Sequence, residues 1–119
     1  MLNGDLVIAI AIWVYVTHIL LMKKKRINAV SCLTNLPSWQ NAHQELNPFK
    51  STNYIGIHLN FTCGQPLSRL WKNHYGSHFT GLPSLLSKIY STRYNKEIFA
   101  TEIMTQIETF TKATEIGRA

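Results

Sequence analysis

His58 is the residue of this 119-residue chain whose type and position best suit it to chemistry. It lies in an alternating apolar and polar run, Tyr54 to Thr62, that predicts a β-strand, and a Gly-Gln-Pro turn follows at residues 64–66. α/β folds place functional groups at the carboxyl ends of their strands. Neutral imidazole binds zinc and other divalent metals, so this position suits a metal ligand. On residue type alone, a single His is more often a structural residue.

His74 and His78 are spaced four residues apart, which suits a metal pair only when both lie on one helix. Gly76 between them predicts a loop, so we do not assign this pair as ligands. Cys32 and Cys63 are the two cysteines of the chain and have no Cys-x-x-Cys spacing. They are too few for a disulfide scaffold.

The elements that must position His58 are predicted from hydrophobic periodicity. Residues 27–33 alternate and predict a strand, and Pro37 precedes a predicted helix over residues 38–46. In the strand over 54–62, His58 shares one face with Asn60 and Thr62, and the opposite face is apolar. That apolar face consists of Ile55, Ile57, Leu59 and Phe61.

Beyond this strand, residues 67–82 are expected to form a loop, and residues 83–90 a short helix. Asn95 is a predicted N-cap for a longer helix that continues to Thr111. The order of strand, helix, strand, loop and helix indicates βαβ units and a parallel sheet, and therefore the α/β class. The long helix carries an apolar stripe of Ile98, Phe99, Ile103, Ile107 and Phe110.

The N-terminal region has two alternative interpretations. Residues 6–22 contain no charged side chain, and the basic block Lys23–Arg26 follows them directly. This arrangement is typical of a short transmembrane helix with a cytoplasmic basic flank. However, its many β-branched residues fit a buried strand equally well. The composition leaves both interpretations open.

The basic charge of the chain does not by itself indicate an anionic partner. Lys and Arg number 12 against 6 Asp and Glu, which gives a net charge of +6, but only 15% of residues are charged. About 25% is usual, so the imbalance reflects scarce acidic residues. The basic block contains no aromatic residue or glycine, and we expect no nucleic-acid partner.

The segment Ile55–Ser68 closely resembles a signature of the YdjC-like carbohydrate deacetylases, the family that includes chitooligosaccharide deacetylase. That signature reads approximately Gly-x-His-x-x-x-Thr-x-Gly-x-Pro-x-Ser, which this chain matches from Gly56 to Ser68. Residues 26–35 are similar to the second strand of the family, and residues 102–110 to a helix with the pattern Glu-x-x-x-Gln-Ile-Glu-x-Phe.

This resemblance implies a (β/α) barrel that binds a divalent metal, Mg²⁺ or Zn²⁺, and hydrolyses the N-acetyl groups of amino sugars or chitooligosaccharides. In such chemistry the metal polarises the amide carbonyl and activates water, and a carboxylate removes the proton of that water. The resemblance assigns His58 as one metal ligand. It identifies no substrate-binding residue in this chain.

The chain departs from the family pattern at both ends. The family opens with an Asn-[Ala/Gly]-Asp-Asp-Phe-Gly strand, of which only Asn3-Gly4-Asp5 is present here, so Asp5 is the candidate catalytic carboxylate. The second metal-histidine motif of the family, Asp-[Ser/Gly]-His-x-His, follows the Gln-Ile-Glu helix and is not reached before Ala119. We therefore expect a partial barrel, truncated before that motif.

Two domains follow from this interpretation. Residues 1–25 form an atypical apolar segment, either a transmembrane helix or a first βα unit altered by a frame disturbance, and residues 26–119 form a partial deacetylase domain. We expect an incomplete, cytoplasmic fragment of a carbohydrate-metabolism hydrolase that is inactive alone and holds metal weakly. The alternative is a small inner-membrane protein, anchored through residues 6–22, that presents a cytoplasmic interaction module without catalysis.

Overall fold

The structure is a computed structural model that describes residues 7–10, 20–26, 28–91 and 94–116. Its strands are β1 (Val7–Ile10), β2 (Ala29–Cys32) and β3 (Tyr54–Ile57), which pair in parallel in the order β1-β2-β3. The helices are α2 (Trp39–Leu46), α3 (Arg69–Tyr75), α4 (Leu82–Ile89) and α5 (Lys96–Thr114), and a 3-10 turn, η1, spans Asn47–Phe49. The predicted α/β class and parallel sheet are confirmed. The barrel stays a prediction.

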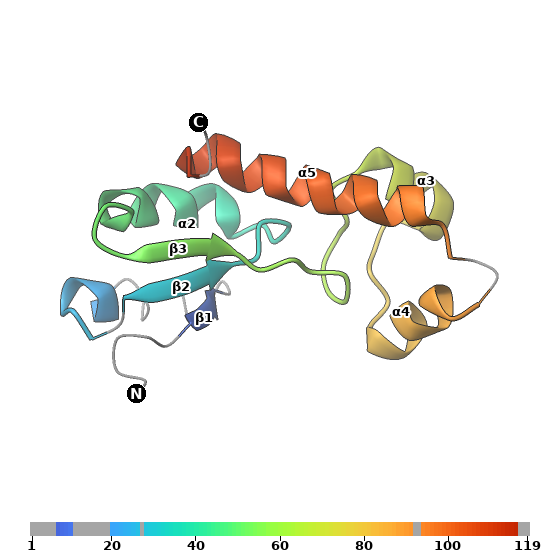
Figure 1. Ribbon diagram of the computed structural model, residues 1–119, viewed down its shortest axis with the longest axis horizontal. Helices are drawn as coiled ribbons and strands as arrows, with labels where there is room; N and C mark the ends of the chain where they lie inside the picture. Colours follow the sequence, from blue (N-terminus) through green and yellow to red (C-terminus); the bar gives the residue numbers. More distant parts are fainter. Residues whose placement is uncertain (1–6, 11–19, 27, 92–93, 117–119) are drawn as a thin grey trace.

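The elements form two neighbouring groups (Figure 1). α2 and the carboxyl half of α5 lie over the sheet, whereas α3, α4 and the amino end of α5 lie beyond the carboxyl ends of the strands. α5 therefore connects the sheet to the region where functional groups were expected. α5 begins after Asn95, whose side chain caps the helix by accepting hydrogen bonds from the backbone N–H groups of Glu97 and Ile98 at 3.0 and 3.3 Å.

Each group has its own apolar core. Between the sheet and its helices, Trp39 of α2 stacks on Phe110 of α5, with ring centroids 5.9 Å apart. Beyond the strands, Trp71 of α3 is only 2% exposed and its ring meets Phe99 of α5 at 4.7 Å. Full burial of one large apolar side chain contributes about 2–3 kcal/mol, so these contacts fix both ends of α5.

Two sequence predictions in this region were wrong. The expected loop over 67–82 contains helix α3, which begins where the Ser68 hydroxyl accepts a hydrogen bond from the Trp71 backbone N–H at 3.2 Å. The strand expected to reach Thr62 ends at Ile57, and Leu59, predicted on the apolar face, is 39% exposed. In both cases, polar contacts to distant residues direct the backbone, and periodicity does not detect such contacts.

The N-terminal apolar stretch is described in part. Residues 7–10 form strand β1, which pairs with β2 from Val7 opposite Ala29 to Ile10 opposite Cys32. This agrees with the strand interpretation and contradicts a continuous helix over 6–22. Among the described ranges, no helix combines the length and apolar character needed to cross a bilayer. Asp5, the candidate carboxylate, lies outside the described residues.

Candidate functional site

His58 follows the last residue of β3, at the carboxyl end of the sheet. Its backbone N–H donates to the carbonyl of Cys32 at 2.8 Å, which extends the β2–β3 pairing by one bond. Its side chain is exposed. The imidazole is therefore attached to a fixed backbone position and is accessible to a ligand from solvent.

The loop after His58, residues 59–68, is held by the side chain of Asn60. Asn60 is 5% exposed, and its carboxamide oxygen accepts from the backbone N–H groups of Thr62 and Cys63 at 3.1 and 3.2 Å. Its amide nitrogen donates to the carbonyl of Cys63 and to the side-chain oxygen of Asn35, both at 2.8 Å. These bonds close the turn and end the strand.

Asn35, which follows β2, joins the two loops at this edge of the sheet. Its side-chain nitrogen donates to the carbonyls of Cys63 and Gln65 at 3.1 and 3.0 Å. Gly64 lies directly against this contact and has a φ of +76°. A Cβ at Gly64 would lie 3.2 Å from the Asn35 side-chain nitrogen and 2.9 Å from Cδ2 of Leu36. Its backbone conformation therefore favours glycine, and a side chain here would also have to displace the end of the Leu36 side chain.

Gln106 of α5 holds the start of the loop from the other side. Its side-chain oxygen accepts from the Asn60 backbone N–H at 2.9 Å, and its nitrogen donates to the Asn60 carbonyl at 2.7 Å. That nitrogen also donates to Glu102 at 2.8 Å. Gln106 is fully buried, so each of its polar atoms needs a protein partner, and each has one.

Glu102, one helical turn earlier, holds the end of the loop. Its two carboxylate oxygens accept from the backbone N–H groups of Leu67 and Ser68 at 3.0 and 2.8 Å. Together with Gln106, three donors surround this fully buried carboxylate. A buried anion is tolerated when hydrogen bonds replace its hydration. We call Glu102 and Gln106 the α5 clamp.

The α5 clamp was not predicted from the sequence. The apolar stripe was assigned to positions that include Ile103 and Ile107, but these two side chains are only partly buried, whereas Glu102 and Gln106 are inaccessible. Two signals were present: the family pattern Glu-x-x-x-Gln marks both positions, and two polar residues four apart share one helical face.

A pocket of about 420 Å³ opens beside the clamped loop. The segment after β2 and the start of α2 form one wall, residues 64–67 form another, and His78 also lines the pocket. His78 is separated from α3, which carries His74, by Gly76. The two histidines therefore do not share a helix, the arrangement in which residues four apart can form a metal pair.

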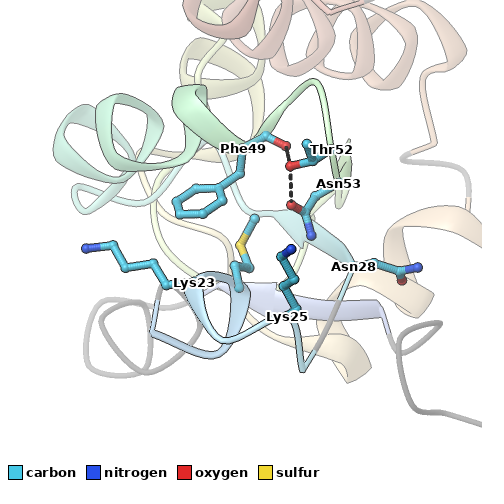
Figure 2. Close-up of a pocket in the computed structure, with 7 residues that line it drawn as sticks. Lys23, Lys25, Asn28, Phe49, Thr52 and Asn53 are labelled. Atoms are coloured by element: carbon cyan, nitrogen blue, oxygen red, sulfur yellow. Dashed lines mark hydrogen bonds between the residues drawn. The ribbon is translucent and has the colours of Figure 1, made fainter.

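A second pocket, of about 400 Å³, lies at the opposite end of the sheet, before the strands begin (Figure 2). Met22 and Phe49 line it together with polar residues, and Lys23 and Lys25 supply positive charge at its rim. Thr52 donates to the Asn53 side chain there at 3.0 Å. The positive charge of the basic block is thus located away from His58.

The two cysteines differ in their environment. Cys32 is fully buried at the end of β2, and this burial raises the pKa of its thiol from 9.0 to about 12. Cys63 is exposed in the clamped loop, and both thiols are free. Cys32 therefore acts as a small apolar core residue and does not take part in the chemistry of the site.

Comparison with known proteins relates this arrangement to one family. The sequence profile of a family described as YdjC-like protein matches residues 18–116. A search among curated proteins gave no match. Among solved structures, the chain is similar to a proposed cellobiose-phosphate cleavage protein from Enterococcus faecalis V583, with 20% identity and a TM-score of 0.69. The alignment covers 93% of this chain and 45% of that protein, so this chain spans less than half of its length.

Proposed function

Because this chain belongs to the YdjC-like protein family, we propose that it contributes to the hydrolysis of acetyl groups from N-acetylated amino sugars. In this proposal His58 is a ligand of a divalent metal, Mg²⁺ or Zn²⁺, and Asp5 is a catalytic carboxylate. The solved structure with the same fold is named for cleavage of a phosphorylated disaccharide, which is also a carbohydrate reaction. A carbohydrate substrate class is therefore the common element.

The position of His58 is the observation that carries the proposal. Its side chain is exposed at the carboxyl end of β3, its backbone N–H is bound to Cys32, and the loop that follows it is held by the α5 clamp. Metal ligands work best when hydrogen bonds and packing fix their backbone in advance. His58 has this support at the edge of the sheet, whereas His74 lies on the short helix α3 and His78 in the segment after Gly76.

His58 does not form a complete metal site with the other described residues. Within ranges 20–26, 28–91 and 94–116, no three His, Cys, Asp or Glu side chains come together to hold a metal. A catalytic zinc ion normally has about three protein ligands. With one assigned ligand, we propose weak metal binding and assign to His58 only the role of holding one coordination position.

A zinc titration followed by NMR tests the role of His58. We expect the imidazole signal of His58 to shift at a lower zinc concentration than the signals of His74 and His78, because only His58 is assigned as a metal ligand in this proposal. His58→Ala should abolish this early response, and His74→Ala, the matched control, should leave it unchanged. Equal responses from all three histidines would contradict the proposal.

Release of acetate from N-acetylglucosamine oligomers tests the activity. Because no three candidate metal ligands come together among the described residues, we expect the chain on its own not to turn over substrate with either metal. Turnover that is lost in His58→Ala and retained in His74→Ala would overturn that expectation and establish the site as sufficient. Turnover retained in His58→Ala would show that the assigned ligand is wrong.

A further inference from the structure

We propose that the 420 Å³ pocket beside the clamped loop binds an uncharged sugar ring, with Gln40, Gln65 and His78 as its ligand-contacting groups. This inference rests on the proposed carbohydrate function and specifies the chemical class and location of the bound group. The pocket volume lies within the range that is usual for small-molecule sites, about 300–1,000 Å³.

The chemistry of the lining carries the choice of ligand. No described Asp, Glu, Lys or Arg lines the pocket, and amide and imidazole groups lie among apolar ones. Such groups donate to and accept from sugar hydroxyls, whereas phosphate recognition usually employs Arg or Lys. The lining residues are Thr34, Asn35, Leu36, Pro37, Gln40, Gly64, Gln65, Leu67 and His78.

The walls of the pocket are fixed in advance. Asn35 is 7% exposed and its side chain is already fully engaged with Cys63, Gln65 and Asn60, so it acts as scaffold. In contrast, the side-chain amides of Gln40 and Gln65 are exposed and make no hydrogen bond to another described residue. A preformed wall that presents uncommitted amides can bind a ligand without the cost of ordering a loop.

His78 adds a third group with a defined role. Its Nδ1 lies 3.1 Å from the hydroxyl of Ser77, and its side chain is exposed and lines the pocket. The other ring nitrogen, Nε2, is the one left for a ligand, and the imidazole face offers an apolar surface to a sugar ring. The lysines at 23 and 25 line the separate pocket of Figure 2, so the two pockets differ in charge.

NMR titration of the ¹⁵N-labelled chain with three probes tests this inference without requiring metal or turnover. The probes are diacetylchitobiose, cellobiose and glucose 6-phosphate. We expect the two neutral disaccharides to shift the side-chain amide signals of Gln40 and Gln65, and glucose 6-phosphate not to bind there more tightly. Strongest binding of glucose 6-phosphate at these amides, or no shift with either neutral sugar, would overturn the inference.

Two single substitutions provide a second test of the pocket. Gln65→Ala should weaken neutral-sugar binding about fivefold, the usual effect of losing one hydrogen bond. Gln44→Ala, an exposed glutamine on α2 that does not line the pocket, should leave the affinity unchanged. Equal effects of the two variants would contradict the site. Sugar binding without a His58-dependent zinc response would count against the proposed function alone, whereas a His58-dependent zinc response without these shifts would count against this inference alone.

Discussion

Removing the charge of Glu102 should loosen the loop that follows His58. In Glu102→Gln, an NH₂ group replaces one carboxylate oxygen while the size of the side chain is kept. One oxygen accepts from Ser68 N–H, and the other from Leu67 N–H and Gln106. In either orientation, the new NH₂ group faces at least one N–H donor, and that buried donor loses its acceptor.

The magnitude follows from these contacts. Turning the new NH₂ group toward Ser68 sacrifices one bond, whereas the opposite orientation sacrifices two. Loss of one hydrogen bond to a buried charged group costs about 1.5–3 kcal/mol, and the remaining bonds lose their charge assistance. We therefore expect the free energy of unfolding to fall by about 2–3 kcal/mol, a large fraction of the 5–15 kcal/mol typical of a domain.

Urea denaturation of wild type, Glu102→Gln and Glu108→Gln measures this effect. Glu108 is exposed on the same helix and forms no ion pair or hydrogen bond with another described residue, so its variant should stay within about 0.5 kcal/mol of wild type. Amide hydrogen exchange should accelerate at Leu67 and Ser68 in Glu102→Gln alone. If both variants unfold at the same urea concentration, or if Ser68 exchange is unchanged, the α5 clamp does not hold the loop as argued.

Three further predictions concern single residues. Gly64→Ala should lower the free energy of unfolding by about 1–3 kcal/mol in urea titrations, because the φ of Gly64 is +76° and a Cβ there would meet Leu36. The control is Gly56→Ala, which has open space around it and should lower the free energy of unfolding by less than about 1 kcal/mol. The pKa of the Cys32 thiol is about 12 in the folded state, against 9.0 for an exposed thiol. Between these two pH values the thiol is protonated in the folded state and ionised in the unfolded state. Stability should therefore fall as the pH rises from 9.0 toward 12, and Cys32→Ala should remove this part of the pH dependence of urea unfolding. Asn95→Ala should cost about 1 kcal/mol by thermal denaturation, because two helix N–H groups lose their cap; an unchanged melting temperature would contradict that role.

Much of the fold could be predicted because its signals are local. α4 and α5 were expected at residues 83–90 and from Asn95 onward, and they occupy Leu82–Ile89 and Lys96–Thr114. The residue that caps a helix and the apolar residues that mark its period lie close together in the sequence. The parallel pairing followed equally from the alternation of strands and helices.

The remaining features depend on partners far away in the chain. The strand of His58 ends early because Asn60 turns the backbone toward Gln106, and α3 begins where Glu102 holds Ser68. Neither contact can be recognised from the spacing of apolar residues in the sequence. The family pattern marked several of these positions, but only the structure shows that Glu102 binds the backbone N–H groups of Leu67 and Ser68.

The sequence separation between the α5 clamp and its loop has a consequence for folding. Asn60 and Gln106 are 46 positions apart, and Ser68 and Glu102 are 34 apart. Contacts of such separation form only after a long loop has closed, and they slow folding relative to local contacts. During synthesis the N-terminal end of a chain emerges first. Strand β3, which His58 follows directly, therefore leaves the ribosome well before α5, and until α5 docks, the polar groups of this loop stay bonded to water.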